Sequence, residues 1–118
     1  MATVFTQGTR EQDIVRWEVN RNYSREVVTV PANTTVAVGS VLKATHVPLG
    51  KGEEAQAVEI ALQAAKTGAA ETKDIVVLRR MAIVVDTYLD YGDADNVPAA
   101  VNAALKSLGI LVEHGLTA

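Results

Sequence analysis

The sequence predicts a small, mainly β domain with one α-helix near its C-terminus and a flexible N-terminal arm. Two observations favour this fold class. β-Branched residues fill the segments 25–30 and 74–86, as is typical of strands, and residues 97–108 combine helical spacing with helix-terminating residues. The length of 118 residues suits one domain. We therefore expect an arm over residues 1–13 and a single domain over residues 14–118.

The first part of the domain consists of short strand-like runs separated by turn residues. Val15, Trp17 and Val19 recur with a period of two, which indicates a half-buried strand. Residues 25–30 form a second β-branched run, and the turn residues at 31–33 end it. Two strands are therefore expected before residue 34.

A third strand-like run covers residues 41–47, stops at Pro48 and is followed by a glycine-rich turn at 50–52. The next segment, residues 53–66, is ambiguous. Helical spacing is shown by Val58, Ala61, Leu62 and Ala65, whereas strand alternation is shown by Val58, Ile60, Leu62 and Ala64. The composition favours the helix, and the periodicity leaves both structures open.

Residues 74–86 are the most apolar part of the chain. Two β-branched runs within them are separated by Arg79 and Arg80, so two strands or one long bent strand are expected. Arginine pairs of this kind are more often an interface or surface pair than a clamp for an anion.

Residues 97–108 predict a helix with one apolar face, formed by Val97, Val101, Ala104, Leu105 and Leu108. Asp95 or Asn96 can cap its start, Pro98 is tolerated in the first turn, and Gly109 fits its end. Residues 110–112 then predict a short final strand.

Composition and charge exclude several classes of protein. Cysteine is absent, which excludes disulfide frameworks, thiolate metal sites and cysteine nucleophiles. No apolar run is long enough to span a membrane, and residues 1–10 do not resemble a secretory signal. Residues 1–51 carry six basic and four acidic side chains, and residues 52–118 carry five and ten. Because the basic residues alternate with acids, we expect no nucleic-acid binding.

The residue types that carry chemistry form no recognised motif. His46 and His114 lack a second ligand at a metal-binding spacing, so both are expected to be structural or surface residues. The acidic stretch 86–95 does not fit the glycine and glutamate positions of an EF-hand loop. The glycine pair at 50–52 lacks the rest of a phosphate-binding loop. We expect no catalytic residue, no cofactor and no metal.

Five segments occur in an order that resembles a known family: YSREVVTV at 23–30, VGSVLKA at 38–44, IVVLR at 75–79, AIV at 82–84 and AAVNAALKSLGILV at 99–112. Together they resemble the head decoration proteins of tailed bacteriophages, the lambda protein D type. The resemblance covers about residues 22–112. No single motif suffices, but their order and spacing are hard to obtain by chance.

The resemblance implies a β-clip-like fold and a structural role. Such proteins form trimers at local three-fold axes on the outer surface of the expanded head. There they cement neighbouring subunits of the major capsid protein against the pressure of packaged DNA. The protein would be made in the bacterial cytoplasm and end on the virion. The resemblance also implies a strand at 57–64, and we adopt it over the helix.

The N-terminal arm would pair with capsid strands, according to the same resemblance, by adding a strand through main-chain hydrogen bonds. The expected contact residues are Thr3, Val4, Phe5, Thr6 and Gln7, with Val4 and Phe5 as the anchors. Two alternatives remain. A small oligomeric β-domain that binds a soluble ligand would need a pocket and not the arm. An enzyme with a dispersed Ser, His and Asp triad would need His46 or His114.

Overall fold

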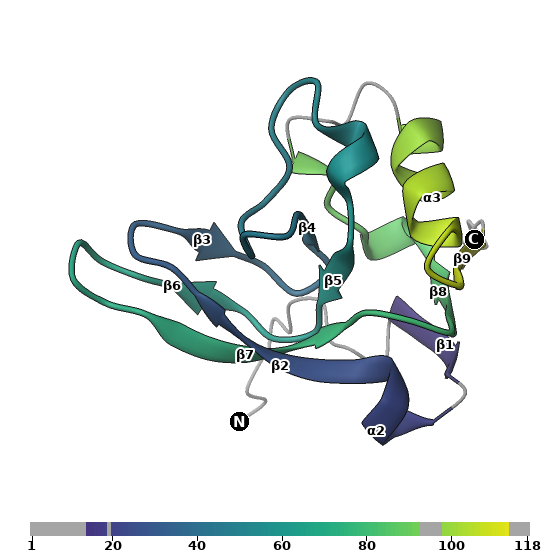
Figure 1. Ribbon diagram of the computed structural model, residues 1–118, viewed down its shortest axis with the longest axis horizontal. Helices are drawn as coiled ribbons and strands as arrows, with labels where there is room; N and C mark the ends of the chain where they lie inside the picture. The colour runs from purple at the N-terminus through teal and green to yellow at the C-terminus, as the bar shows by residue number, and fades with distance from the viewer. Residues whose placement is uncertain (1–13, 19, 93–97, 114–118) are drawn as a thin grey trace, which may run out of the picture.

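The computed structural model describes residues 14–18, 20–92 and 98–113 and shows a mainly β fold (Figure 1). Its elements, in chain order, are β1 (Val15–Glu18), α2 (Arg21–Ser24), β2 (Arg25–Val30), β3 (Thr35–Val36), β4 (Val41–Leu42), η1 (Glu54–Gln56), β5 (Glu59–Ala61), β6 (Ala65–Lys66), β7 (Lys73–Leu78), β8 (Ala82–Val85), η2 (Asp86–Tyr88), α3 (Pro98–Lys106) and β9 (Ile110–Glu113). The predicted fold class is confirmed.

The strands form three sheets. Sheet A has the order β1-β8-β9, sheet B the order β2-β7-β5-β4, and sheet C consists of β3 and β6. In sheet B, β2 and β7 pair antiparallel over six residues, from Arg25 opposite Leu78 to Val30 opposite Lys73. This long ribbon carries the small sheet C at one end (Figure 1). β-Branched side chains dominate both strands and suit a pleated surface.

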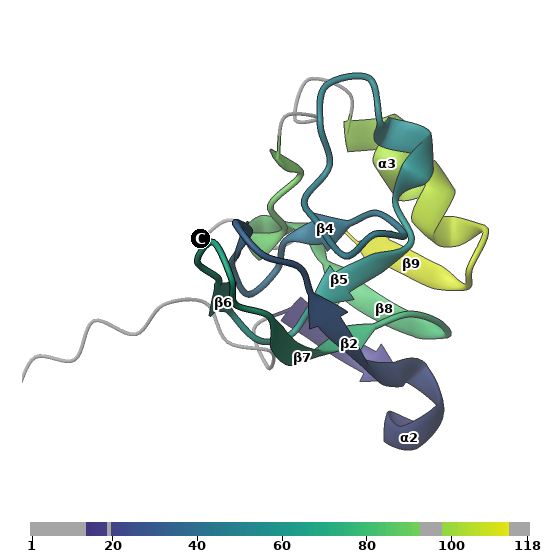
Figure 2. The same ribbon diagram turned by 60° about the vertical axis from the view of Figure 1, so that its left-hand side comes forward.

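Sheet A contains the first and the last strand of the described chain, β1 and β9. β1 pairs antiparallel with β8, and β8 pairs parallel with β9. Because a parallel neighbour requires a crossover, the chain leaves β8 through η2 and returns through α3, which packs against β9 and η1 (Figure 2). Gly109 ends the helix with a φ of 83°, a conformation that glycine adopts without steric cost.

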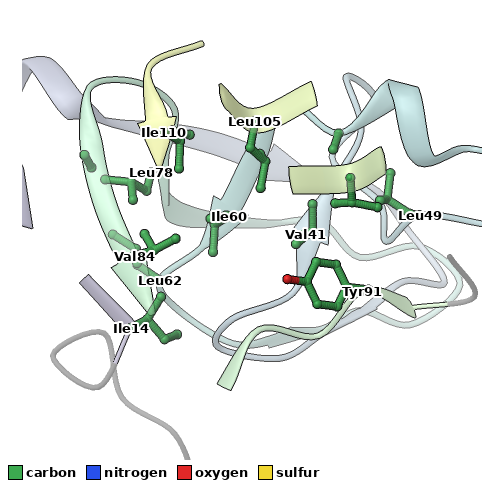
Figure 3. Close-up of a cluster of buried hydrophobic side chains, with 13 residues drawn as sticks. Ile14, Val41, Leu49, Ile60, Leu62, Leu78, Val84, Tyr91, Leu105 and Ile110 are labelled. Carbon is green, nitrogen blue, oxygen red and sulfur yellow. The ribbon is translucent and has the colours of Figure 1, made fainter. Parts of the chain in front are cut away.

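The larger hydrophobic cluster lies between sheet A, sheet B and α3 (Figure 3). Leu105 of α3, Ile60 of β5 and Ile110 of β9 are fully buried in it. Its buried members are Ile14, Val41, Leu49, Ala57, Ile60, Leu62, Leu78, Ala82, Val84, Tyr91, Val101, Leu105 and Ile110. Ile14 therefore fixes the beginning of β1 in the core.

The smaller hydrophobic cluster lies on the other side of sheet B, toward sheet C. It consists of Val28, Val30, Val36, Leu42, Ala61, Ala65, Ile75 and Val77. Successive residues of a strand point to opposite faces, so Ile60 contributes to the larger cluster and Ala61 to the smaller one. The strands β4 and β5 of sheet B are thus covered by side chains on both faces.

Several predicted elements are confirmed. β2 has the predicted bounds 25–30, the apolar segment 74–86 contains two strands in different sheets, and α3 and β9 follow as expected. α3 buries Val101 and Leu105, while Leu108 is 36% exposed. The two residues proposed to cap the helix, Asp95 and Asn96, lie outside the described residues.

Three strand predictions need correction. The run 41–47 is a strand only at Val41–Leu42, because His46 adopts a left-handed φ of 67° and the chain turns there. The strand expected at 57–64 is confirmed over a helix but covers only Glu59–Ala61. In β1 the period of two is broken by an irregular register between Val15 and Trp17.

Candidate functional site

The serine residues and the described histidine are not brought together. Ser24 Oγ donates to the Met81 carbonyl, Ser40 Oγ accepts from the Ala37 N–H, and Ser107 Oγ donates to the Ala104 carbonyl. All three hydroxyl groups therefore bond the backbone, as expected for local structural roles. His114 lies outside the described residues.

His46 instead pairs with a buried carboxylate that the sequence analysis missed. Its Nδ1 lies 3.0 Å from Oε1 of Glu59, whose side chain is fully buried, and Glu59 Oε2 has no hydrogen-bond partner among the described residues. Burial raises the pKa of Glu59, and the contact with His46 opposes that rise. Nothing in the sequence indicated that Glu59 is buried, since its burial results from the packing that covers both faces of β5.

A second polar cluster joins β2 to the turn after β7. Arg79 Nη1 and Arg80 Nη2 bind the two carboxylate oxygens of Glu26 at 2.6 and 3.0 Å. Hydrogen bonds from Arg79 and Arg80 lower the pKa of Glu26. The Arg80 guanidinium also lies 5.3 Å from the centre of the Tyr23 ring. The arginine pair is thus a surface ion-pair cluster, as the sequence indicated.

This cluster borders a surface hollow of about 390 Å³, lined by Tyr23, Val58, Arg79, Arg80 and Leu108. Both of its guanidinium groups already bind Glu26. An incoming anion would have to compete with that carboxylate. The hollow therefore gives little support to the alternative of a domain that binds a soluble ligand.

The acidic stretch 86–95 is described only up to residue 92. Asp90 Oδ1 accepts a hydrogen bond from the Gly92 N–H at 2.9 Å, which is a local turn contact. Within the described ranges, no three His, Asp or Glu side chains gather as a metal site. The described helices also include none long and apolar enough to cross a membrane.

The outer face of sheet A carries a row of apolar side chains, one from each strand. Trp17 of β1 lies opposite Ile83 of β8, and Ile83 lies opposite Leu111 of β9. Trp17 is 51% exposed and Leu111 is 45% exposed. We call Trp17, Ile83 and Leu111 the apolar row. Exposed apolar groups that adjoin one another mark interaction surfaces more often than scattered ones do.

The expected arm contacts lie outside the described residues, and so does the boundary between arm and domain at residue 13. This applies to Thr3, Val4, Phe5, Thr6 and Gln7. The arm contacts therefore stay predictions. The apolar row was missed because the predicted alternation in β1 overlooked the irregular register between Val15 and Trp17.

The described residues thus form a small β-rich protein whose distinctive features are the apolar row on sheet A and a surface ion-pair cluster. The chain belongs to the family of bacteriophage lambda head decoration protein D, whose family model matches residues 4–110. No curated protein sequence matches the chain. The family is a structural one that places the protein on the capsid surface of the virion, and the resemblance drawn from the five sequence segments is confirmed.

Proposed function

We propose that this protein cements the expanded phage head as a trimer. Each trimer would occupy a local three-fold axis on the outer surface and join neighbouring subunits of the major capsid protein against the pressure of packaged DNA. The observation that carries this proposal is the family match, which spans residues 4–110 and so includes most of the arm as well as the folded domain. Decoration requires no catalytic group.

The arm supplies the first contact with the shell. Val4 and Phe5 are the only sizeable apolar residues between residues 2 and 13, and they stand among small and polar neighbours. Such a segment can add a strand to an exposed sheet edge of the capsid, with main-chain hydrogen bonds for affinity and side-chain pockets for specificity. Thr3, Thr6 and Gln7 flank the two anchors and complete the added strand.

Binding by this route stabilises the expanded shell through mass action. A protein that binds the expanded state and not its precursor shifts the equilibrium toward the expanded state. A trimer at a three-fold position also engages three equal sites, so its overall affinity exceeds that of one arm. Many modest contacts, repeated by symmetry, then resist the lateral pull of internal pressure.

Co-sedimentation with expanded, undecorated heads tests the proposal. Full-length protein is compared with a truncated form that begins at Ile14, whose own folding is checked by circular dichroism. We expect saturable binding of the full-length protein and loss of most binding by the truncated form. Equal binding of both would overturn the arm mechanism and keep decoration. No binding by either would contradict decoration and favour the soluble-ligand alternative.

A further inference from the structure

The apolar row spans all three strands of sheet A and faces away from the core. In β8 and β9 the neighbours of the row point inward: Ala82 and Val84 flank Ile83, Ile110 precedes Leu111, and all three neighbours are buried. The alternation of a strand therefore places Ile83 and Leu111 on the outer face. Side chains directly opposite on adjacent strands lie close enough to form one continuous surface.

An irregularity in β1 adds Trp17 to this face. Val15 lies opposite Val84 and Trp17 opposite Ile83, so Arg16 and Trp17 together oppose one residue of β8. An extra residue of this kind is a β-bulge, a device that redirects side chains at sheet edges. Both Arg16 and Trp17 are exposed as a result.

The charges beside the row neutralise each other. Arg16 Nη1 binds Glu113 Oε2, and this ion pair joins the two edge strands of sheet A. The row is therefore bordered by a closed ion pair and not by a free charge at this end. A patch with these properties suits an apolar partner surface, and tryptophan is among the residues that contribute most at protein interfaces.

Sheet B also carries an exposed apolar residue, on its edge strand β2. Val27 on β2 is 68% exposed, more than any member of the row. Its neighbours on the same face of the strand are Arg25 and Thr29, and Thr29 Oγ1 donates to Asp74 Oδ1 at 2.7 Å. Across the sheet Val27 lies opposite Val76, which is partly buried and packs against the larger cluster. Val27 is thus one exposed side chain beside the core and not part of a row across three strands, which is ordinary for a protein surface.

We propose that the apolar row is the surface through which the folded domain docks on the capsid shell, beside the site that receives the arm. The inference rests on the proposed function. Ile14 is fully buried and fixes the point where the arm joins the domain. Since an extended residue spans at most about 3.6 Å, Trp17 lies within roughly 11 Å of Ile14. The arm therefore leaves the domain at sheet A, and the row meets an apolar patch of the shell that holds the arm.

The test uses full-length variants and expanded, undecorated heads. Leu111→Glu places a carboxylate in the row, and Trp17→Ala removes its largest side chain. Val27→Glu is the matched control, since it puts the same charge on a more exposed apolar residue of another sheet. Urea denaturation verifies folding of each variant, and sedimentation equilibrium measures its oligomeric state.

We expect Leu111→Glu and Trp17→Ala to bind heads at least about tenfold more weakly than the wild type, with Val27→Glu unchanged and all oligomeric states equal. Unchanged binding by both row variants would overturn the inference and leave the proposed function standing. Loss of self-association in these variants would overturn it in favour of a second copy as the partner. Failure of the wild type to bind would overturn both the inference and the proposed function.

Discussion

The two hydrophobic clusters on either side of sheet B are built differently. The larger cluster contains long side chains from sheets A and B and from α3, including Leu105 and Ile110. The smaller cluster consists largely of valine and alanine, and polar groups surround it: Glu59, Thr34 and Thr67 are buried near it. The larger cluster therefore supplies most apolar burial, whereas the smaller one is bordered by the hydrogen bonds that Thr34 and Thr67 form.

The two clusters therefore stabilise different parts of the domain. The larger cluster anchors β1 and β9, the strands that carry the apolar row and lead to the termini. The smaller cluster supports the opposite end, where sheet C and its turns project from the β2–β7 ribbon (Figure 1). Substitutions in the larger cluster should accordingly lower stability by creating cavities. Substitutions around the smaller cluster should lower it by leaving polar groups unpaired.

Leu105→Ala should have the largest effect on stability. Leu105 is fully buried in the larger cluster, so its truncation leaves a cavity between α3 and the sheets and should cost about 2–5 kcal/mol of unfolding free energy. Urea denaturation followed by circular dichroism measures the loss. A cost below about 1 kcal/mol would show that the larger cluster does not hold the domain together.

Thr67→Val tests the polar border of the smaller cluster. Thr67 Oγ1 donates to the Pro31 carbonyl at 2.6 Å and accepts from the Thr34 N–H at 3.0 Å. Valine keeps the volume and leaves both backbone groups unpaired, so we expect a loss of about 1–3 kcal/mol in the same assay. Thr67→Ser, which retains the hydroxyl, is the control and should recover most of this loss. Equal losses in the two variants would refute the hydrogen-bond explanation.

Glu59→Gln should change how stability depends on pH. Because burial raises the pKa of Glu59 above its ordinary 4.5, the folded protein holds this proton more tightly than the unfolded chain. Ionisation of Glu59 therefore lowers stability as the pH rises through the folded-state pKa. The stability of Glu59→Gln relative to wild type should increase over that range, measured by urea midpoints from pH 4 to 8. Parallel profiles would contradict this.

Glu26→Gln should have the smallest effect and the opposite sign. Arg79 and Arg80 lower the pKa of Glu26, so its contribution is present above pH 4.5 and is lost as the pH falls through the lowered pKa. The side chain is 39% exposed, and solvent screening limits the expected loss at neutral pH to about 0.2–1 kcal/mol. A salt titration of the urea midpoint measures it, since the wild type alone should weaken toward the variant. A larger loss that is insensitive to salt would mean that Glu26 has a packing role.

Local pattern was enough to predict the elements whose residues are intrinsically suited to them. β2 and α3 were found because β-branched and helix-forming residues are concentrated there. The burial of Glu59 could not be predicted, because only the packing of both clusters on sheet B reveals that β5 is covered on two faces. The turn at His46 and the bulge before Trp17 are changes of backbone conformation at single residues, and hydrophobic periodicity does not reveal them.

The surface features also differ in how far the sequence predicts them. The family and the arm came from segment order, whereas the apolar row needed the strand register. Trp17 and Leu111 are far apart in sequence, and only β8 between them makes them neighbours across the sheet. Such a neighbour relation cannot be predicted from the sequence until the order of the strands in the sheet is known.

A cryo-electron microscopy reconstruction of expanded heads saturated with the full-length protein would show directly how the domain and the arm lie on the shell. We expect three copies around each local three-fold axis, with sheet A and the apolar row against the shell and the arm continuing onto a capsid strand. Single copies at other positions, or sheet A turned away from the shell, would contradict this arrangement.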